Sequence, residues 1–152
     1  MKKLAALILV LCLLLPCMAE HKSLKDFVSD YNIYADIAGA GELSETDISY
    51  DAENGKYRVN DSNRLTILFG NKFDGCSCAA PIAQSIDFMR TATAIYLTVN
   101  GSDSIIDFLG MLSYGVMFAG KVNTDNYNFA GNTMFKVTSD GDYYYFVITV
   151  IA

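Results

Sequence analysis

Residues Pro81 to Gly120 read PIAQSIDFMRTATAIYLTVNGSDSIIDFLGMLSYGVMFAG and predict two apolar helices joined at Asn100-Gly101. The first helix has two apolar stripes at helical spacing, so it is expected to pack against two neighbours. These stripes are Ile82, Ile86, Met89 and Thr93, and Phe88, Ala92, Ile95 and Val99. The second helix repeats the pattern with Ile105, Leu109, Leu112 and Val116, beside Phe108, Met111 and Phe118. Such a helix pair needs a sheet to cover it.

The ends of this helix pair carry the usual terminal residues. Pro81 suits the first helical position, where its missing N–H would be unsatisfied anyway, and Gly120 suits the residue after the last turn. Gly110 and Gly115 lower the helix propensity by roughly 1 kcal/mol each relative to alanine. Either these glycines mark close backbone packing, or the helix ends before Val116.

Strand patterns follow the helix pair. TMFKVTS and DYYYFVITVIA flank Asp140-Gly141, a two-residue hairpin signal. The final run is so continuously apolar that we expect it to lie centrally in the sheet with both faces covered. The polar segment KVNTDNYNFAGN before them predicts an exposed loop with at most one short edge strand.

The N-terminal half predicts a helix and three strands. Ser23 is a suitable N-cap for an amphipathic helix that ends near Gly39 and Gly41. Asn54-Gly55 predicts a hairpin between strands at 47–51 and 56–60, and RLTILFG predicts a third strand. The segment NKFDGCSCAA is expected to be a loop leading into the helix pair.

We therefore predict an α+β fold with the element order α-β-β-β-α-α-β-β. One antiparallel sheet of about five strands carries the N-terminal helix and the helical hairpin on one face. Residues 27–152 form a single domain, and residues 20–26 a flexible N-terminus.

The first nineteen residues have the pattern of a signal peptide. Lys2 and Lys3 precede an apolar run from Leu4 to Leu15, and small residues follow, so cleavage is expected after Ala19. The run is shorter than the ~20 residues that span a bilayer. We expect a protein that is secreted or associated with the cell envelope.

Charge restricts the partners of the processed chain. The whole chain has 11 basic and 17 acidic residues, and removing two lysines leaves 9 basic residues and a net charge of −8. Nucleic-acid binding needs clustered lysine and arginine, so this balance argues against it.

Cys76 and Cys78 are the cysteines that remain after removal of the signal peptide, and three interpretations stay open. A disulfide between them needs a kinked backbone, because extended residues two apart lie about 7 Å from each other at their Cα atoms. Such a strained bridge is easily reduced and suits redox chemistry. A metal site has only half a ligand shell here, since the single histidine, His21, is on the N-terminus. The third interpretation is a cysteine pair without chemistry.

Other residues predict no catalytic site, no metal site and no cofactor site. The acids Glu42, Glu45, Asp47, Asp51, Glu53 and Asp61 lack the register of a calcium loop and are expected to form a solvated hairpin face. Tyr143, Tyr144 and Tyr145 stand side by side in a strand, so at least one must face away from the other two. These tyrosines either form a recognition surface or cover the core.

The opening SLKDFVSDYNIYADIAG, with Phe27 and Tyr31-Asn32, resembles small secreted proteins and lipoproteins of gut-type Firmicutes. The resemblance extends to the order of strands, helix pair and final strand pair. It implies export from a Gram-positive bacterium and an α+β unit similar to the repeat of beta-lactamase inhibitory protein, and it brings no known catalytic residues. This chain lacks the lipobox of many of those proteins, since Cys12 follows Leu11 and Cys17 follows Pro16.

Two functions follow as hypotheses. The first is a non-enzymatic module that binds a protein or cell-surface partner through its sheet face or its acidic hairpin loops. The alternative is a thiol-disulfide or metal-linked function of Cys76 and Cys78.

Overall fold

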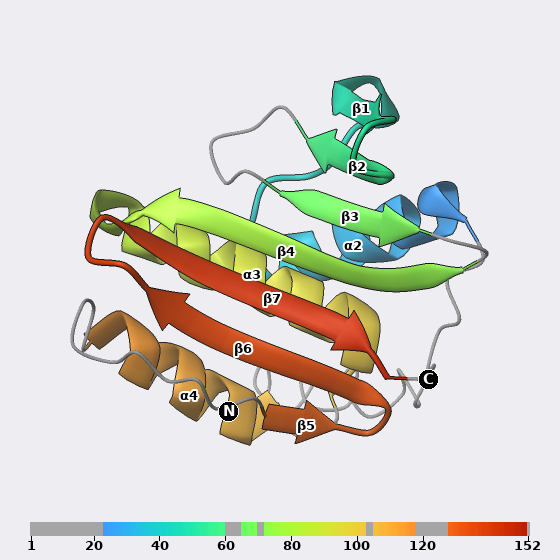
Figure 1. Cartoon of the computed structure of the whole chain (residues 1–152). Helices are drawn as coiled ribbons and strands as arrows, with labels where there is room; N and C mark the ends of the chain where they lie inside the picture. Colours follow the sequence, from blue (N-terminus) through green and yellow to red (C-terminus); the bar gives the residue numbers. More distant parts are fainter. Residues whose placement is uncertain (1–22, 60–64, 70–71, 103–104, 118–127, 152) are drawn as a thin grey trace.

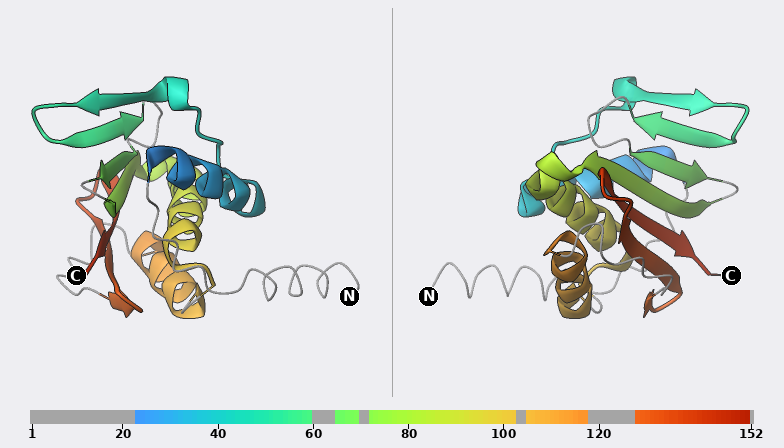
Figure 2. Two further views of the ribbon diagram at one scale, coloured as in Figure 1. Left: turned by 90° about the vertical axis from the view of Figure 1, so that its right-hand side faces the viewer. Right: turned by 60° about the vertical axis from the view of Figure 1, so that its left-hand side comes forward.

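The computed structural model describes residues 23–59, 65–69, 72–102, 105–117 and 128–151. Within these ranges, one antiparallel sheet has the strand order β1-β2-β3-β4-β7-β6-β5, and three α-helices lie on one of its faces (Figure 1, Figure 2). The predicted α+β class with a single antiparallel sheet is confirmed. The predicted number of about five strands is wrong, because seven are present. The expected signal peptide at 1–19 and the helix end at Gly120 lie outside the described residues.

Helix α2 (Leu24–Ala38) agrees with the sequence pattern. The Ser23 hydroxyl accepts a hydrogen bond from the backbone N–H of Asp26 at 3.2 Å, and the helix ends at Gly39, whose φ is 70°. The described end of the segment 20–26, expected to be flexible, is therefore the cap and first turn of a helix. The helix buries Phe27, Val28, Tyr31 and Ala35. It packs mainly against α3, and the Phe27 ring contacts Phe69 and Phe73 of the sheet.

A three-stranded region follows at one side of the sheet. A short 3₁₀ turn (Glu45–Asp47) leads into β1 (Ile48–Asp51), which pairs with β2 (Lys56–Val59) across the Asn54-Gly55 turn. The predicted third strand is β3 (Thr66–Phe69), and it pairs with β2. Ring contacts among Phe27, Phe69 and Phe73 join this region to α2.

The expected loop at residues 71–80 is instead strand β4 (Phe73–Pro81), which lies in the centre of the sheet between β3 and β7. The prediction failed because glycine, aspartate and alanine have low strand propensity. The place of β4 in the centre of the sheet requires small side chains. A Cβ at Gly75 would lie 2.7 Å from the backbone carbonyl oxygen of Ile148, so only glycine fits there without a shift of backbone.

The C-terminal hairpin agrees with its sequence signal in position. Strands β6 (Thr133–Ser139) and β7 (Tyr143–Val150) pair across Asp140-Gly141, and the short edge strand β5 (Asn128–Ala130) pairs with β6. Strand β7 is central, but the prediction that both its faces are covered is wrong. No element in the described ranges covers the face opposite the helices, where Val147 is 41% exposed.

Helices α3 and α4 form the predicted pair, joined at Gly101, whose φ is 59°. Pro81 is the last residue of β4 and not the first of a helix, because a 3₁₀ turn (Ile82–Gln84) precedes α3 (Ser85–Asn100). Two neighbours were expected for α3, but it packs against four elements, the helices α2 and α4 and the strands β4 and β7. Helix α4 (Ile105–Met117) packs on β6 and α3, and Tyr96 stacks on Phe108 with ring centroids 4.1 Å apart.

The two glycines inside α4 should respond oppositely to alanine. A Cβ at Gly115 would lie 2.8 Å from Cγ1 of the buried Val137, whereas a Cβ at Gly110 would meet nothing within 4 Å. In urea unfolding of dilute protein, we expect Gly110→Ala to raise the free energy of unfolding by up to about 1 kcal/mol. Gly115→Ala should lower it by about 1–3 kcal/mol through overpacking.

A second change tests the cause of the Gly115 effect. Val137→Ala should cost less stability in the Gly115→Ala background than in the native chain, because it makes room for the new methyl group. Equal effects of the two glycine substitutions, or strict additivity with Val137→Ala, would contradict this packing.

Candidate functional site

Cys76 and Cys78 lie in the middle of β4, not in a loop. They pair with Ile148 and Phe146 of β7, and both point into the core beneath the helices. The structure holds them as thiols that are not joined to each other. Residues two apart on an extended strand lie about 7 Å from each other at their Cα atoms, which is at the limit for a bridge.

The environment of these thiols opposes exchange chemistry. Burial raises the pKa of the Cys76 thiol well above 9.0, and the neighbouring Cys78 raises it further. The thiolate is the nucleophile and the metal ligand, and a buried neutral thiol offers neither thiolate nor access. Among the described residues, no three His, Cys, Asp or Glu side chains gather as a metal site, and His21 lies outside them. No observation in the described chain favours the thiol or metal function.

The three adjacent tyrosines divide between the two faces of β7. Tyr144 points inward, where its ring stacks on Phe88 at 5.2 Å and its hydroxyl donates to the backbone carbonyl of Val116 at 3.1 Å. Tyr144 is therefore a core residue. Tyr143 and Tyr145 lie on the opposite face, with ring centroids 6.3 Å apart. Of the three adjacent tyrosines, only Tyr143 and Tyr145 can contribute to a recognition surface.

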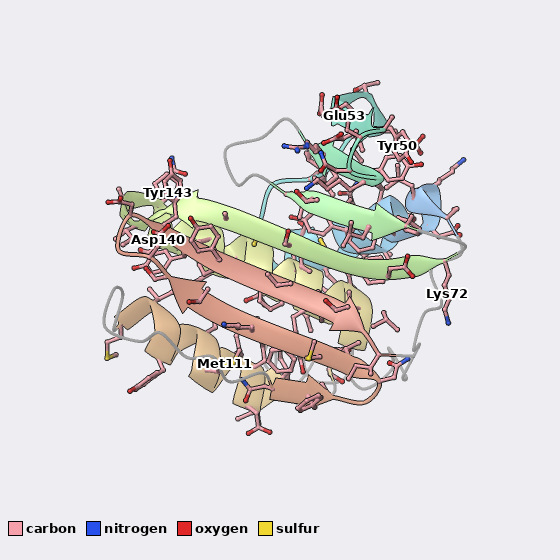
Figure 3. The ribbon with its side chains drawn as sticks, in the orientation of Figure 1. Tyr50, Glu53, Lys72, Met111, Asp140 and Tyr143 are labelled. Carbon is pink, nitrogen blue, oxygen red and sulfur yellow. The ribbon has the colours of Figure 1, made fainter. Side chains whose placement is uncertain are left out.

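Asp140 holds Tyr145 in place at the hairpin turn. Its Oδ2 accepts a hydrogen bond from the Tyr145 hydroxyl at 2.6 Å, and its Oδ1 accepts from the backbone N–H groups of Asp142 and Tyr143. Figure 3 shows Asp140 and Tyr143 at the end of the sheet where β6 turns into β7. The bond from Tyr145, followed by the backbone bonds, lowers the pKa of the Asp140 carboxyl group. The turn thus fixes the orientation of the half-buried Tyr145 ring.

We call the uncovered side of the strands the open sheet face. It centres on Tyr143, Tyr145 and Val147 of β7 and extends to Leu68 of β3 on one side and to Phe129 of β5 on the other. The register sets this grouping, because Val147 pairs with Ser77 of β4 and with Lys136 of β6. Leu68 is 39% exposed and Phe129 64% exposed. The sequence patterns did not single out Val147, Leu68 or Phe129, because apolar strand residues ordinarily indicate burial.

The acidic hairpin is bound within itself. The Asp51 carboxylate accepts hydrogen bonds from Asn54 and from the Arg58 guanidinium, both at 2.8 Å. The Asn54 side chain is the main cause that lowers the pKa of Asp51, and Arg58 adds to it. Tyr50 and Glu53 lie at the far end of this hairpin (Figure 3). The expected acid at Asp61 is outside the described residues.

Comparison with protein-family models, with curated proteins and with solved structures gives no match. None of the described helices has the length and apolar character needed to cross a membrane.

The Asp140 turn generates a pH prediction. A carboxyl group whose folded-state pKa is lowered stabilises the fold above its unfolded pKa, near 3.8, and loses that contribution as the pH falls through the folded pKa. Asp140→Asn should therefore be less stable than the native chain at neutral pH. The difference between the two free energies of unfolding should shrink as the pH is lowered below 3.8.

Asp142→Asn is the matched control, because it changes the charge of the same turn and leaves the hydrogen bonds of Asp140 in place. Because this variant keeps Asp140 and its hydrogen bonds, it should retain the loss of stability below pH 3.8 that Asp140 causes in the native chain. Parallel pH dependences for Asp140→Asn and the native chain would show that Asp140 does not have this role.

Proposed function

We propose that this chain is an exported, non-enzymatic binding module whose open sheet face holds a protein or cell-surface partner. One observation carries the proposal. The three helices occupy one face of the sheet. The other face presents the exposed Leu68, Val147 and Phe129, together with the half-buried rings of Tyr143 and Tyr145. Exposed apolar and aromatic side chains gathered on one face are typical of an interaction site.

The open sheet face is rigid, which favours binding. Strands β4, β7 and β6 each pair with a neighbour on both sides, so the backbone beneath the exposed side chains is fixed by ladder hydrogen bonds. Tyr145 is also held by Asp140. A surface that is already ordered loses little conformational entropy when a partner docks.

The chemistry of this face suits a protein surface. In the described strands β3, β4, β6 and β7, the charged side chains are Asp74 and Lys136. Tyrosine supplies apolar area together with a hydroxyl group, and hydroxyls of Ser77, Thr138 and Thr149 lie among the apolar groups on this side of the register. Aromatic residues with few charges are the usual composition of the centre of a protein interface.

The expected signal peptide at 1–19 supports a partner outside the cytoplasm. The acidic balance of the rest of the chain supports a partner other than nucleic acid. The proposed function has three parts, which are export, a role without enzymatic activity, and the binding of a partner. Each part can be tested separately.

The test is capture of partners by immobilised protein from the medium and envelope of the host, comparing the native chain with Val147→Glu. The substitution places a charge at the centre of the open sheet face, opposite Lys136 of the neighbouring strand, so the fold is retained. We expect Val147→Glu to weaken the binding of a specifically captured partner about tenfold or more.

Ile86→Glu is the matched control. Ile86 is 64% exposed on α3, in the helix layer, and glutamate there is favoured by the first helical turn and by Arg90 four residues later. This variant should bind as the native chain does. Equal capture by all three proteins, or loss with Ile86→Glu alone, would contradict a role for the open sheet face.

A further inference from the structure

Helix α4 is the most apolar helix of the described chain, yet much of it faces outward. Its thirteen residues include one charged side chain, Asp107, and only Phe108 and Leu112 are buried. Figure 2 shows α4 at one end of the helix layer and α2 at the other end, so among the described helices α4 has a neighbour, α3, on one side only. The outward faces of the two helices differ in chemistry. Helix α2 exposes Lys25, Asp26 and Asp36 among its apolar residues.

The exposed residues of α4 form a single stripe. At about 100° per residue they fall within an arc of about 140°. The stripe consists of Ile106, Leu109, Gly110, Ser113, Tyr114 and Met117, all of them exposed. Asp107 lies at its edge, and no charged side chain lies within it. A solvated helix ordinarily places its charges on the outward face, so this stripe has the composition of an interface.

The stripe is symmetric along the helix. Ile106 and Met117 stand at its ends, Leu109 and Tyr114 lie inside them, and Gly110 and Ser113 are in the middle. Two copies of α4 can lie antiparallel, with a two-fold axis passing between Gly110 and Ser113. Ile106 of one copy then meets Met117 of the other, and Leu109 meets Tyr114. Large side chains then face large ones, and the small pair allows the helices to approach closely. A two-fold interface requires this self-complementarity.

The exposed area is sufficient for a weak dimer. Ile106 is 82% exposed, Leu109 40%, Tyr114 53% and Met117 74%. At about 200 Å² for a large side chain, these fractions correspond to roughly 500 Å² per copy, or about 1,000 Å² for a pair, which is the lower limit of a specific interface. Because the stripe is uncharged, two acidic chains can meet there without placing like charges in contact.

We propose that α4 is the interface of a two-fold homodimer, in which Ile106 of one copy contacts Met117 of the other in an antiparallel helix pair. The dimer leaves the open sheet face of each copy uncovered, because α4 lies on the opposite side of the sheet. The inference is independent of the partner proposed above. A dimer would present two copies of that face and so increase its apparent affinity for a multivalent surface.

Sedimentation equilibrium of the chain recovered from its host tests this proposal. We expect reversible dimerisation with a dissociation constant on the order of micromolar. Ile106→Glu and Met117→Lys, each alone, should weaken the dimer at least tenfold. Each substitution places two unpaired charges in the interface, one from each copy. Both positions lie at a helix end that favours the introduced charge, so the fold is retained.

Combining Ile106→Glu with Met117→Lys should restore dimerisation to within about threefold of the native constant, because the two new charges face each other in the proposed register. Ile86→Glu, outside the stripe, should leave dimerisation unchanged. A chain that stays monomeric at millimolar concentration, a dimer indifferent to Ile106→Glu, or a double variant that is not rescued would overturn the proposal. The proposal would also be overturned if the monomer bound phosphatidylcholine–phosphatidylglycerol vesicles and Ile106→Glu abolished this binding.

Discussion

The architecture depends on how closely helix α3 can lie over the central strands β4 and β7. The inward side chains of β4 are small, namely Cys76, Cys78 and Ala80, and they pair with Ile148, Phe146 and Tyr144 of β7. The bulk that fills this layer comes from α3 and β7, through residues such as Phe88 and Ile95, which are fully buried. Close packing requires this exchange of large and small volumes across the interface.

This constraint makes the molecule one-sided. Helix α3 contacts α2, α4, β4 and β7, so the helices form one layer on one face of the sheet, and the described residues supply no second layer. Exposed apolar side chains consequently gather on the open sheet face and on the outward stripe of α4, with others on α2, α3 and β1. These surfaces face away from each other, which allows a partner and a second copy to bind without competition. The thiols are buried, and Asp51 and Asp140 are hydrogen-bonded within their own turns. The surfaces are therefore better candidates for function than these reactive groups.

Local signals in the sequence were sufficient for most elements. Ser23 and Gly39 delimit α2, Asn54-Gly55 and Asp140-Gly141 locate both hairpins, and Gly101 separates the helix pair. These features depend on a few neighbouring residues, so a single sequence contains them. Strand β4 was mistaken for a loop because its residues are small enough to fit under helix α3 and beside β7, a strand distant in the sequence whose Ile148 carbonyl oxygen leaves no room for a Cβ at Gly75. That tertiary requirement outweighs strand propensity.

The candidate surfaces were harder to predict for a related reason. Alternation along a strand shows that Tyr144 faces away from Tyr143 and Tyr145, but it does not show which face the helices cover. The apolar run of β7 suggested two covered faces, and the apolar residues of α4 suggested burial. Cys76 and Cys78 were predicted to lie in a loop, where thiol chemistry would be accessible, but the central strand β4 buries both side chains. Composition indicates how much apolar surface exists, and topology decides where it lies.

The most direct measurement is the reactivity of Cys76 and Cys78 toward an alkylating reagent, resolved by mass spectrometry of the peptide that contains them. With β4 in the centre of the sheet beneath α3, both thiols should resist modification in the native protein. They should react fully once the chain is unfolded in denaturant. Rapid modification of the native protein, or a native Cys76–Cys78 disulfide, would place these residues in an exposed segment and contradict the one-sided sheet.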